Sequence, residues 1–267
     1  MRRLKKPLPS GRAVVTRVFT QVGFYVALLA IWQALVLAKI WPPYLFPTPV
    51  GVWESLQTGF ADHSFWIAIA VSMERMAIGY AISAFLGTIL GLLLVASRFL
   101  EDTLGRLIVS LQSLPSLCWL PLAILWFGLT ERAILFVVVM GSMLSVTIST
   151  ESGLRNVPPI YSMAGRNLGA RAARLFFYVL LPASLPHLLS GLKQGWAFAW
   201  RSLIAGEMIF VTLGLGQLLM MGRDLNDINE VVAVMLLIVA IGFLTDAFFF
   251  RILEQSIQRK WGLTPAS

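Results

Sequence analysis

Two charged side chains, Arg201 and Glu207, stand out because they lie six residues apart in a long hydrophobic segment at about 184–210, which also carries Lys193. An ionised group is costly in lipid, so both side chains should face protein or water. They could line a polar cavity on a path through the membrane, or form a gate with another helix. They could equally belong to a structural ion pair that fixes this segment against a neighbour. The residue types alone leave both interpretations open.

Catalytic and metal-binding patterns were sought and not found. The sequence has no GxxxxGK[ST] phosphate-binding loop, no GxSxG and no HExxH. Its two histidines, His63 and His187, are predicted on opposite sides of a membrane, so they cannot form a paired metal site. A membrane-embedded enzyme would need catalytic groups clustered at one membrane face. We keep that class as the alternative, and we expect no metal, no cofactor and no catalytic residue in this chain.

The composition indicates a membrane protein. The chain has 267 residues, of which 58% are hydrophobic and 13% charged, with a mean hydropathy of +0.79. Soluble globular chains carry about 25% charged residues. Uncharged runs of 21, 22, 24 and 18 residues occupy 18–38, 76–97, 107–130 and 133–150, and about 20 apolar residues span a bilayer. The sequence therefore predicts an all-α integral membrane protein with about six transmembrane helices, at 18–38, 66–97, 107–127, 133–150, 184–210 and 229–250.

Two of these predicted helices carry further signals. In the third, Pro115 and Pro121 flank Cys118, the only cysteine. Two prolines predict a kink with freed carbonyls, which are tolerated in a membrane only against protein or a water-filled cavity. Pro115, Cys118 and Pro121 therefore join Arg201 and Glu207 as candidates for a translocation path, although a kinked packing helix would look the same. In the second helix, a small-residue stripe predicts close packing of another helix; its members are Gly79, Ser83, Gly87 and Gly91.

Basic residues set the expected topology. Fifteen of the 21 lie in segments assigned to the inside, and only Lys39, Arg132 and Arg223 lie in segments assigned to the outside. By the positive-inside rule, both termini should be cytoplasmic. The net charge of +8 then reflects retention of loops inside and not binding of nucleic acid. The expected divisions are a basic tail at 1–17, a first helix and external linker at 18–64, a membrane core at 65–254 and a C-terminal tail at 255–267.

The segment 163–186 is the most polar long interval between the apolar runs. It carries Arg166, Arg171 and Arg174 without an acidic residue, and Pro158 and Pro159 precede it. Proline suits the first turn of a helix, and Gly169 in the middle permits a sharp bend. We expect a short, bent, basic helix pair at the cytoplasmic membrane surface, which a soluble partner could bind.

This segment resembles the cytoplasmic loop of permease subunits of ABC importers. In that family the loop reads Glu-Ala-Ala, three residues, Gly, nine residues, Ile, one residue and Leu-Pro. Here Met163-Ala164-Gly165 is followed at the same spacing by Gly169, Val179 and Leu181-Pro182. Met163 stands where the family has an acid, and Gly165 replaces the second alanine. Further stretches resemble the branch of the family that imports nitrate, sulfonates and taurine. The likeness therefore runs from about residue 44 to the C-terminus. The matching stretches are LFPTPVGVWESL (45–56), LPSLCWLPLAILWFGL (114–129), LPASLPHLLSGLKQGWAFAW (181–200), AGEMIF (205–210) and GLGQLL (214–219).

The resemblance implies a type I ABC importer permease fold in the bacterial plasma membrane, with 155–183 as the coupling loop. It implies two ATPase subunits that bind ATP and Mg²⁺, a second permease subunit that is identical (a homodimer) or similar, and a periplasmic or lipid-anchored substrate-binding protein. The solute would be a nitrate-, sulfonate- or taurine-like anion or a related small organic compound. The residues that the resemblance assigns to ATPase docking are Met163, Ala164, Gly165, Arg166, Leu168, Gly169, Ala170, Arg171, Leu181 and Pro182.

Overall fold

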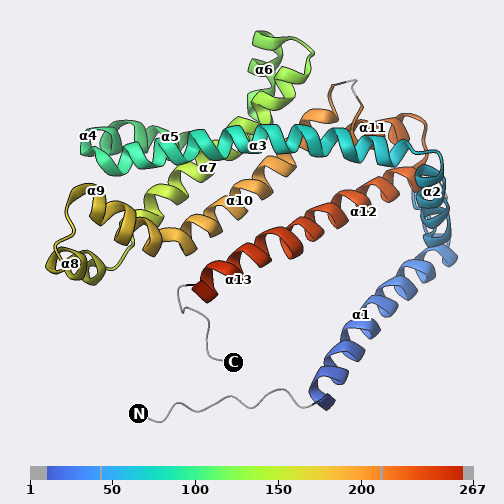
Figure 1. The fold of residues 1–267 in the computed structure, drawn as a ribbon. Helices are drawn as coiled ribbons and strands as arrows, with labels where there is room; N and C mark the ends of the chain where they lie inside the picture. Colours follow the sequence, from blue (N-terminus) through green and yellow to red (C-terminus); the bar gives the residue numbers. More distant parts are fainter. Residues whose placement is uncertain (1–10, 43, 211–212, 261–267) are drawn as a thin grey trace.

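The computed structural model describes residues 11–42, 44–210 and 213–260, and every regular element in these ranges is helical (Figure 1). Short π-helical turns join α4 to α5, α9 to α10 and α12 to α13, and a 3-10 turn at Ser116–Trp119 leads into α6. The helices are α1 (Gly11–Leu37), α2 (Pro49–Ala61), α3 (Ser64–Ala96), α4 (Arg98–Leu100), α5 (Arg106–Gln112), α6 (Leu120–Phe127), α7 (Glu131–Arg155), α8 (Pro159–Asn167), α9 (Ala172–Leu175), α10 (Leu181–Glu207), α11 (Leu215–Asp224), α12 (Ile228–Leu244) and α13 (Arg251–Lys260).

Five helical segments in the described ranges are long and apolar enough to cross a membrane: Phe19–Leu37, Ser64–Ala96, Glu131–Arg155, Ala172–Glu207 and Ile228–Ile257. A sixth crossing results if the bent pair Arg98–Gln112 and Ser116–Phe127 is taken as one span. The predicted all-α membrane architecture with about six spans is therefore confirmed.

Helices α3, α7 and α10 form the centre of the bundle. The predicted small-residue stripe on α3 faces α7: Gly79, Ser83, Gly87 and Gly91 are all buried. A Cβ added at Gly91 would lie 2.6 Å from the Thr150 Cβ, so only glycine permits this approach. The close packing that the stripe predicted is confirmed.

The third predicted span differs from expectation. Instead of one kinked helix over 107–127, two helical segments meet at an angle of 106°. Residues 98–106, which lead into this span, are helical as well. The break follows from Pro115, which has no N–H and disfavours helical geometry in the residue before it. Ser113 completes the end of the first segment, because its hydroxyl donates to the Ser110 carbonyl (2.7 Å).

The first and the last helix reach into the segments that were expected to be tails. Helix α1 already begins at Gly11, inside the expected 1–17 tail, and α13 continues to Lys260, inside the expected 255–267 tail. The remaining parts of both predicted tails, 1–10 and 261–267, lie outside the described residues. Within the expected linker the chain forms α2, and the Thr48 hydroxyl caps this helix by accepting from Gly51 N–H (2.9 Å).

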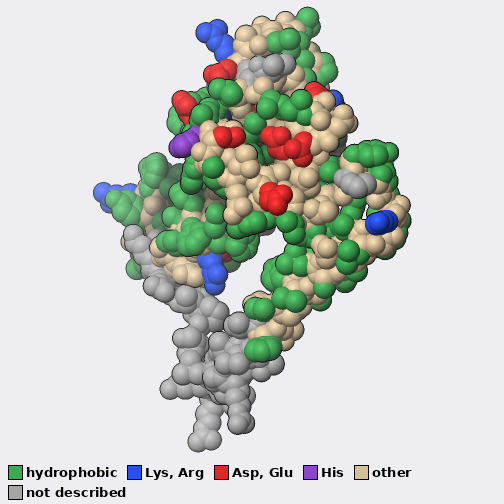
Figure 2. Space-filling view, turned by 90° about the vertical axis from the view of Figure 1, so that its right-hand side faces the viewer, with side chains coloured by type: hydrophobic (Ala, Val, Ile, Leu, Met, Phe, Trp, Pro, Cys, Tyr) green, Lys and Arg blue, Asp and Glu red, His purple; other side chains and the backbone are tan. Residues whose placement is uncertain are grey.

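The two ends of the bundle differ in charge. Helices α4, α8 and α9 lie at one end, and α2 and α11 lie at the other (Figure 1). The α2 end holds a cavity lined by four carboxylates, from Glu54, Asp62, Asp227 and Glu230. Figure 2 shows acidic side chains gathered on this face. The Ser64 N–H donates to Asp62 (2.9 Å) and, with the Ser64 hydroxyl, holds the pKa of that carboxyl below its usual value.

Candidate functional site

The bent helix pair expected around Gly169 is present. Pro159 begins α8, and Gly169 follows its end with a φ of +86°, a conformation that favours glycine. Two backbone hydrogen bonds close the turn, from Gly169 N–H to Arg166 O and from Ala170 N–H to Gly165 O, both 2.9 Å. Gly165 lets α8 lie against the chain that returns to α10, since an added Cβ would be 2.8 Å from Leu175.

The α8–α9 surface is both basic and apolar. Leu168 is 88% exposed, and Met163 is 56% exposed. Arg166, Arg171 and Arg174 are exposed around them, and Ala164 is exposed as well. Exposed apolar side chains beside exposed arginines are typical of a protein-binding surface.

Two of the ten residues assigned to docking lie elsewhere. Leu181 and Pro182 are half-buried and begin α10, so they belong to the base of the loop and not to its exposed tip. Gly165 is buried and shapes the loop from within. The exposed tip therefore consists of α8 and the turn that follows it.

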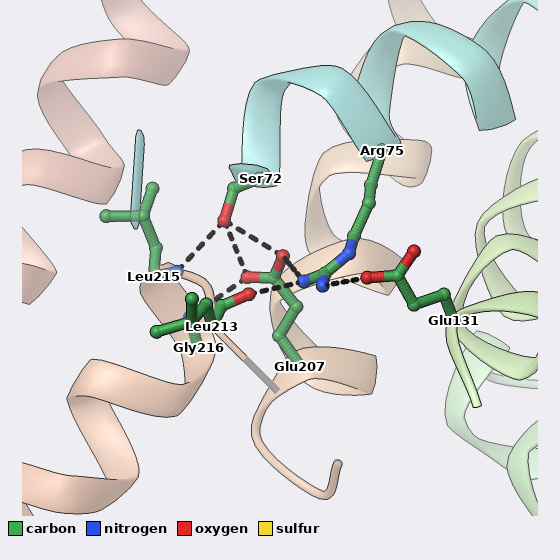
Figure 3. A network of polar contacts seen from close by, with 7 residues as sticks. All are labelled: Ser72, Arg75, Glu131, Glu207, Leu213, Leu215 and Gly216. Atoms are coloured by element: carbon green, nitrogen blue, oxygen red, sulfur yellow. Dashed lines mark hydrogen bonds and ion pairs between the residues drawn. The ribbon is translucent and has the colours of Figure 1, made fainter. Parts of the chain in front are cut away.

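Glu207 belongs to a buried polar network at the opposite end of α10 (Figure 3). Its side chain is fully buried and accepts from the Ser72 hydroxyl (2.8 and 2.9 Å), from Arg75 Nη1 (3.1 Å) and from Gly216 N–H (3.1 Å). Arg75 also donates to the Leu213 carbonyl (2.6 Å) and pairs with Glu131 (2.7 Å). The network ties α3 to α7, to the end of α10 and to the start of α11.

This arrangement favours the structural ion-pair interpretation of Glu207. Its partner is Arg75 of α3, to which the sequence analysis assigned no role. A signal was available, since Arg75 lies three residues after Ser72 and four before Gly79, on the same buried face of α3. An arginine on the small-residue face of an apolar helix requires an anionic partner.

A second ion pair joins two further spans. Lys193 of α10 contacts Asp246, in the π-helical turn after α12, at 2.6 Å. The carboxylate of Asp246 is within reach of Lys193 and neutralises its charge.

A cavity of about 280 Å³ lies where the broken helix pair meets α7 and α10. Pro115 and Arg201 line it, as do Gln112, Ser116, Gly141 and Ser145. The other three path candidates do not line it: Cys118 and Pro121 are exposed on the 3-10 turn and α6, and Glu207 is in the buried network. Within the described part of the chain, no group of three or more His, Cys, Asp or Glu is placed to hold a metal ion.

Taken together, the long apolar helices define a multi-pass membrane protein with an exposed basic loop at one end and a cavity between its helices. Comparison with known proteins is more specific. Residues 79–259 match the family described as binding-protein-dependent transport system inner membrane component.

Similar proteins with assigned names are also permease proteins of transport systems. The chain is 29% identical over 250 residues to the taurine transport system permease protein of Escherichia coli (strain K12), which covers 92% of this chain and 90% of the relative. It is 33% identical over 236 residues to a putative aliphatic sulfonates transport permease protein of the same organism, covering 88% of each. It is 29% identical over 230 residues to a nitrate import permease protein of Synechocystis, covering 83% and 82%.

Solved structures give the same fold. An inward-facing structure of the MetNI methionine ABC transporter matches with a TM-score of 0.58 at 21% identity, covering 72% of this chain and 97% of that one. An amino acid ABC transporter matches with a TM-score of 0.59 at 18% identity, covering 75% and 96%. The chain belongs to the family of inner-membrane permease components of binding-protein-dependent ABC importers.

Proposed function

We propose that this chain forms the membrane path of an ATP-driven importer for a small anion and is coupled to two ATPase subunits through the loop 163–182. A second copy of the chain completes the path, and a periplasmic or lipid-anchored binding protein delivers the solute. ATP and Mg²⁺ are bound by the ATPase subunits, since this sequence has no phosphate-binding loop. The complex lies in the bacterial plasma membrane with both termini of this chain in the cytoplasm.

One observation carries the coupling proposal: the exposed apolar and basic surface of α8 lies at the end of the bundle, outside the long apolar spans (Figure 1). Leu168 at 88% exposure is otherwise an unexplained apolar side chain in a polar loop. A cleft on a soluble ATPase would cover it, while the arginines would meet acidic groups at the rim.

The connection from the loop to the membrane core supports a mechanical role. Helix α9, its π-helical turn and α10 follow one another without a break from Ala172 to Glu207. Movement of α8 would therefore be passed along one continuous helical segment to the level of Arg201. ATP binding on the partner would bias two orientations of this segment, and the path would open to one side or the other.

The relatives support a small anion as the solute. Their names include taurine, aliphatic sulfonates and nitrate, which are small ions that carry a sulfonate group or are oxyanions. The alternative class is a membrane-embedded enzyme; among the described residues no group of His, Cys, Asp or Glu is placed to give it a metal centre.

Substitutions at Gly169 test the coupling loop. No atom lies within 4 Å of a Cβ added there, so Gly169→Ala should cost only the strain of a positive φ, about 1 kcal/mol. Gly169→Glu should reach the membrane at normal level but lose the ATPase during purification and lose uptake, because a charged side chain would protrude into the partner's cleft. The measurements are membrane abundance, ATPase co-purification and uptake of radiolabelled taurine and nitrate.

Gly128 provides a matched control. It also has a positive φ, +66°, and no atom within 4 Å of an added Cβ, but it precedes α7 at a distance from the loop. Gly128→Glu should therefore retain the ATPase. Normal ATPase retention and uptake by Gly169→Glu would exclude this loop as the coupling element.

A further inference from the structure

The basic residues within or beside the spans differ in whether a carboxylate pairs with them. Arg75 is paired with Glu131 and Glu207, and Lys193 is paired with Asp246. Arg201 has no carboxylate within ion-pair distance among the described residues. Its recorded contacts are the Ala197 carbonyl, which accepts from Nε at 3.2 Å, and the Phe198 ring, 5.1 Å from Cζ. An unpaired arginine at this depth is expected to face water or an anion.

The surroundings of Arg201 meet that expectation. It lines the 280 Å³ cavity between the broken helix pair, α7 and α10, and it is the only charged residue of the lining, all of which is described. A cavity whose single charge is a guanidinium attracts anions and repels cations. The volume is slightly below the range of about 300–1,000 Å³ typical of pockets for drug-sized ligands, so a small solute would fit.

Ser145 provides a second, independent indication of a ligand. It lines the same cavity from α7, is only 2% exposed, and its hydroxyl has no hydrogen-bond partner. A buried hydroxyl without a partner costs about 1–3 kcal/mol unless a ligand or water completes it. Most buried polar groups are paired. The Ser145 oxygen is shielded by its neighbours, so a change of its χ1 rotamer would be needed to turn this unpaired donor toward an occupant of the cavity.

The break in the helix adds donors on the opposite wall. Pro115 and Ser116 line the cavity where the second helical segment, Ser116–Phe127, begins. Ser116 begins a 3-10 turn of four residues and brings a hydroxyl side chain to the cavity lining. Gln112, at the end of the preceding segment, contributes a side-chain amide to the same cavity.

We infer that this cavity is a binding site for a small oxyanion in the membrane path, in which Arg201 supplies the charge and Ser145 and Ser116 supply hydrogen bonds. This inference rests on the proposed import function and specifies where the solute binds. The chemistry is shared by nitrate and by the sulfonate group of an organic sulfonate, because both present several oxygen acceptors around a single negative charge. The guanidinium matches such oxygens better than a point charge would.

A single reporter cysteine tests the charge preference of the cavity. Cys118, the only native cysteine, is replaced by serine, and Ser116→Cys is introduced in the full-length chain, assembled with its partner subunits in permeabilised membranes. The rate of modification by the anionic reagent sulfonatoethyl methanethiosulfonate is compared with that of its trimethylammonium analogue. Use of the ratio of rates cancels changes in thiol reactivity that affect both reagents equally.

We expect the anionic reagent to react faster by about tenfold, as a focused positive potential predicts. Arg201→Gln should reduce the ratio about tenfold, and Arg201→Lys should retain most of it. Millimolar ethanesulfonate or nitrate should slow modification, whereas ethyltrimethylammonium should not. Arg223→Gln is the matched control, because Arg223 is exposed and paired with Asp224. It should leave the ratio unchanged.

A ratio near one, a ratio unaffected by Arg201→Gln, or equal protection by anion and cation would overturn the inference. Ser113→Cys, on the same cavity wall, gives a second reporter if Ser116→Cys does not assemble. The assay requires neither ATP hydrolysis nor a binding protein. Loss of coupling in the Gly169 experiment therefore leaves this test intact, and a negative result here leaves the coupling proposal intact.

Discussion

At the scale of single residues, Arg201 and Glu207 have different surroundings although six residues separate them. Glu207, at the end of α10, is fully buried and accepts hydrogen bonds from Ser72, Arg75 and Gly216. Arg201, less than two turns earlier, faces a cavity without a carboxylate. A buried charge is tolerated when donors and a counter-charge satisfy it, and Glu207 meets this condition within the protein. Arg201 is exposed and has no carboxylate partner among the described residues, and it carries the binding proposal because it lines the cavity.

Glu207→Gln should destabilise the protein strongly. It removes one member of a buried ion pair and places an amide against donors that require an acceptor, a change that typically costs about 3–5 kcal/mol. The midpoint of thermal unfolding of the purified protein in detergent is the measurement. Glu131→Gln is the matched control, because Glu131 pairs with the same Arg75 but has a side chain 67% exposed. The control should cost at most about 1 kcal/mol, and equal losses in both variants would contradict the importance assigned to burial.

At the scale of elements, the bundle depends on the approach of α3 to α7. Gly87 and Gly91 of α3 lie against the backbone of α7, where an added Cβ would be 2.7 Å from the carbonyl oxygens of Met143 and Thr147 respectively. Lipid supplies no hydrophobic drive between helices, so close backbone contact provides the attraction. This contact also fixes the position of Ser145, since α7 carries it to the wall of the cavity.

Gly91→Leu should therefore separate α3 from α7, with a loss of about 1–3 kcal/mol or more as an overpacked core predicts. The matched control is Gly23→Leu in α1, a helical glycine with no atom within 4 Å of an added Cβ. Both changes replace glycine by the same good helix former, so helix propensity cancels in the comparison. Thermal unfolding midpoints decide the prediction; a loss in Gly23→Leu as large as in Gly91→Leu would show that the cost does not come from the α3–α7 contact.

At the scale of the whole molecule, the two ends of the bundle have opposite character. The α8–α9 end exposes arginines and apolar residues. At the α2 end four carboxylates line a cavity, and Figure 2 shows acidic side chains gathered on that face. Basic loops are retained in the cytoplasm, whereas acidic residues contribute little to orientation. The distribution supports the proposed orientation, with α8 inside and α2 outside.

A pair of matched cysteines tests this orientation. Asp102 and Asp224 are both exposed, at 68% and 63%, and each is paired with a nearby arginine, Arg106 and Arg223. In a chain with Cys118→Ser, an impermeant thiol reagent added to intact cells should label Asp224→Cys and spare Asp102→Cys. After permeabilisation both positions should be labelled, which controls for reactivity. The reverse pattern in intact cells would place α8 outside and exclude contact with a cytoplasmic ATPase.

Much of this protein was determined by the sequence alone. Long uncharged runs fix the helical membrane fold, because a backbone in lipid must satisfy its hydrogen bonds internally. The bend at Gly169 and the packing stripe on α3 were also predictable, since each depends on the conformation or size of glycine at a known spacing. These features are local, or repeat along one helix, and so appear in the sequence.

Only the tertiary structure decided which charges meet and which remain free. Arg75 and Glu207 are 132 residues apart in the chain, and Lys193 and Asp246 belong to different spans, so no spacing rule pairs them. The 106° break before Ser116 likewise turned an expected kinked span into the wall of a cavity. The sequence identified Arg201 as a costly charge in an apolar helix. That it lines a cavity without a carboxylate follows from how α7, α10 and the broken pair pack around it.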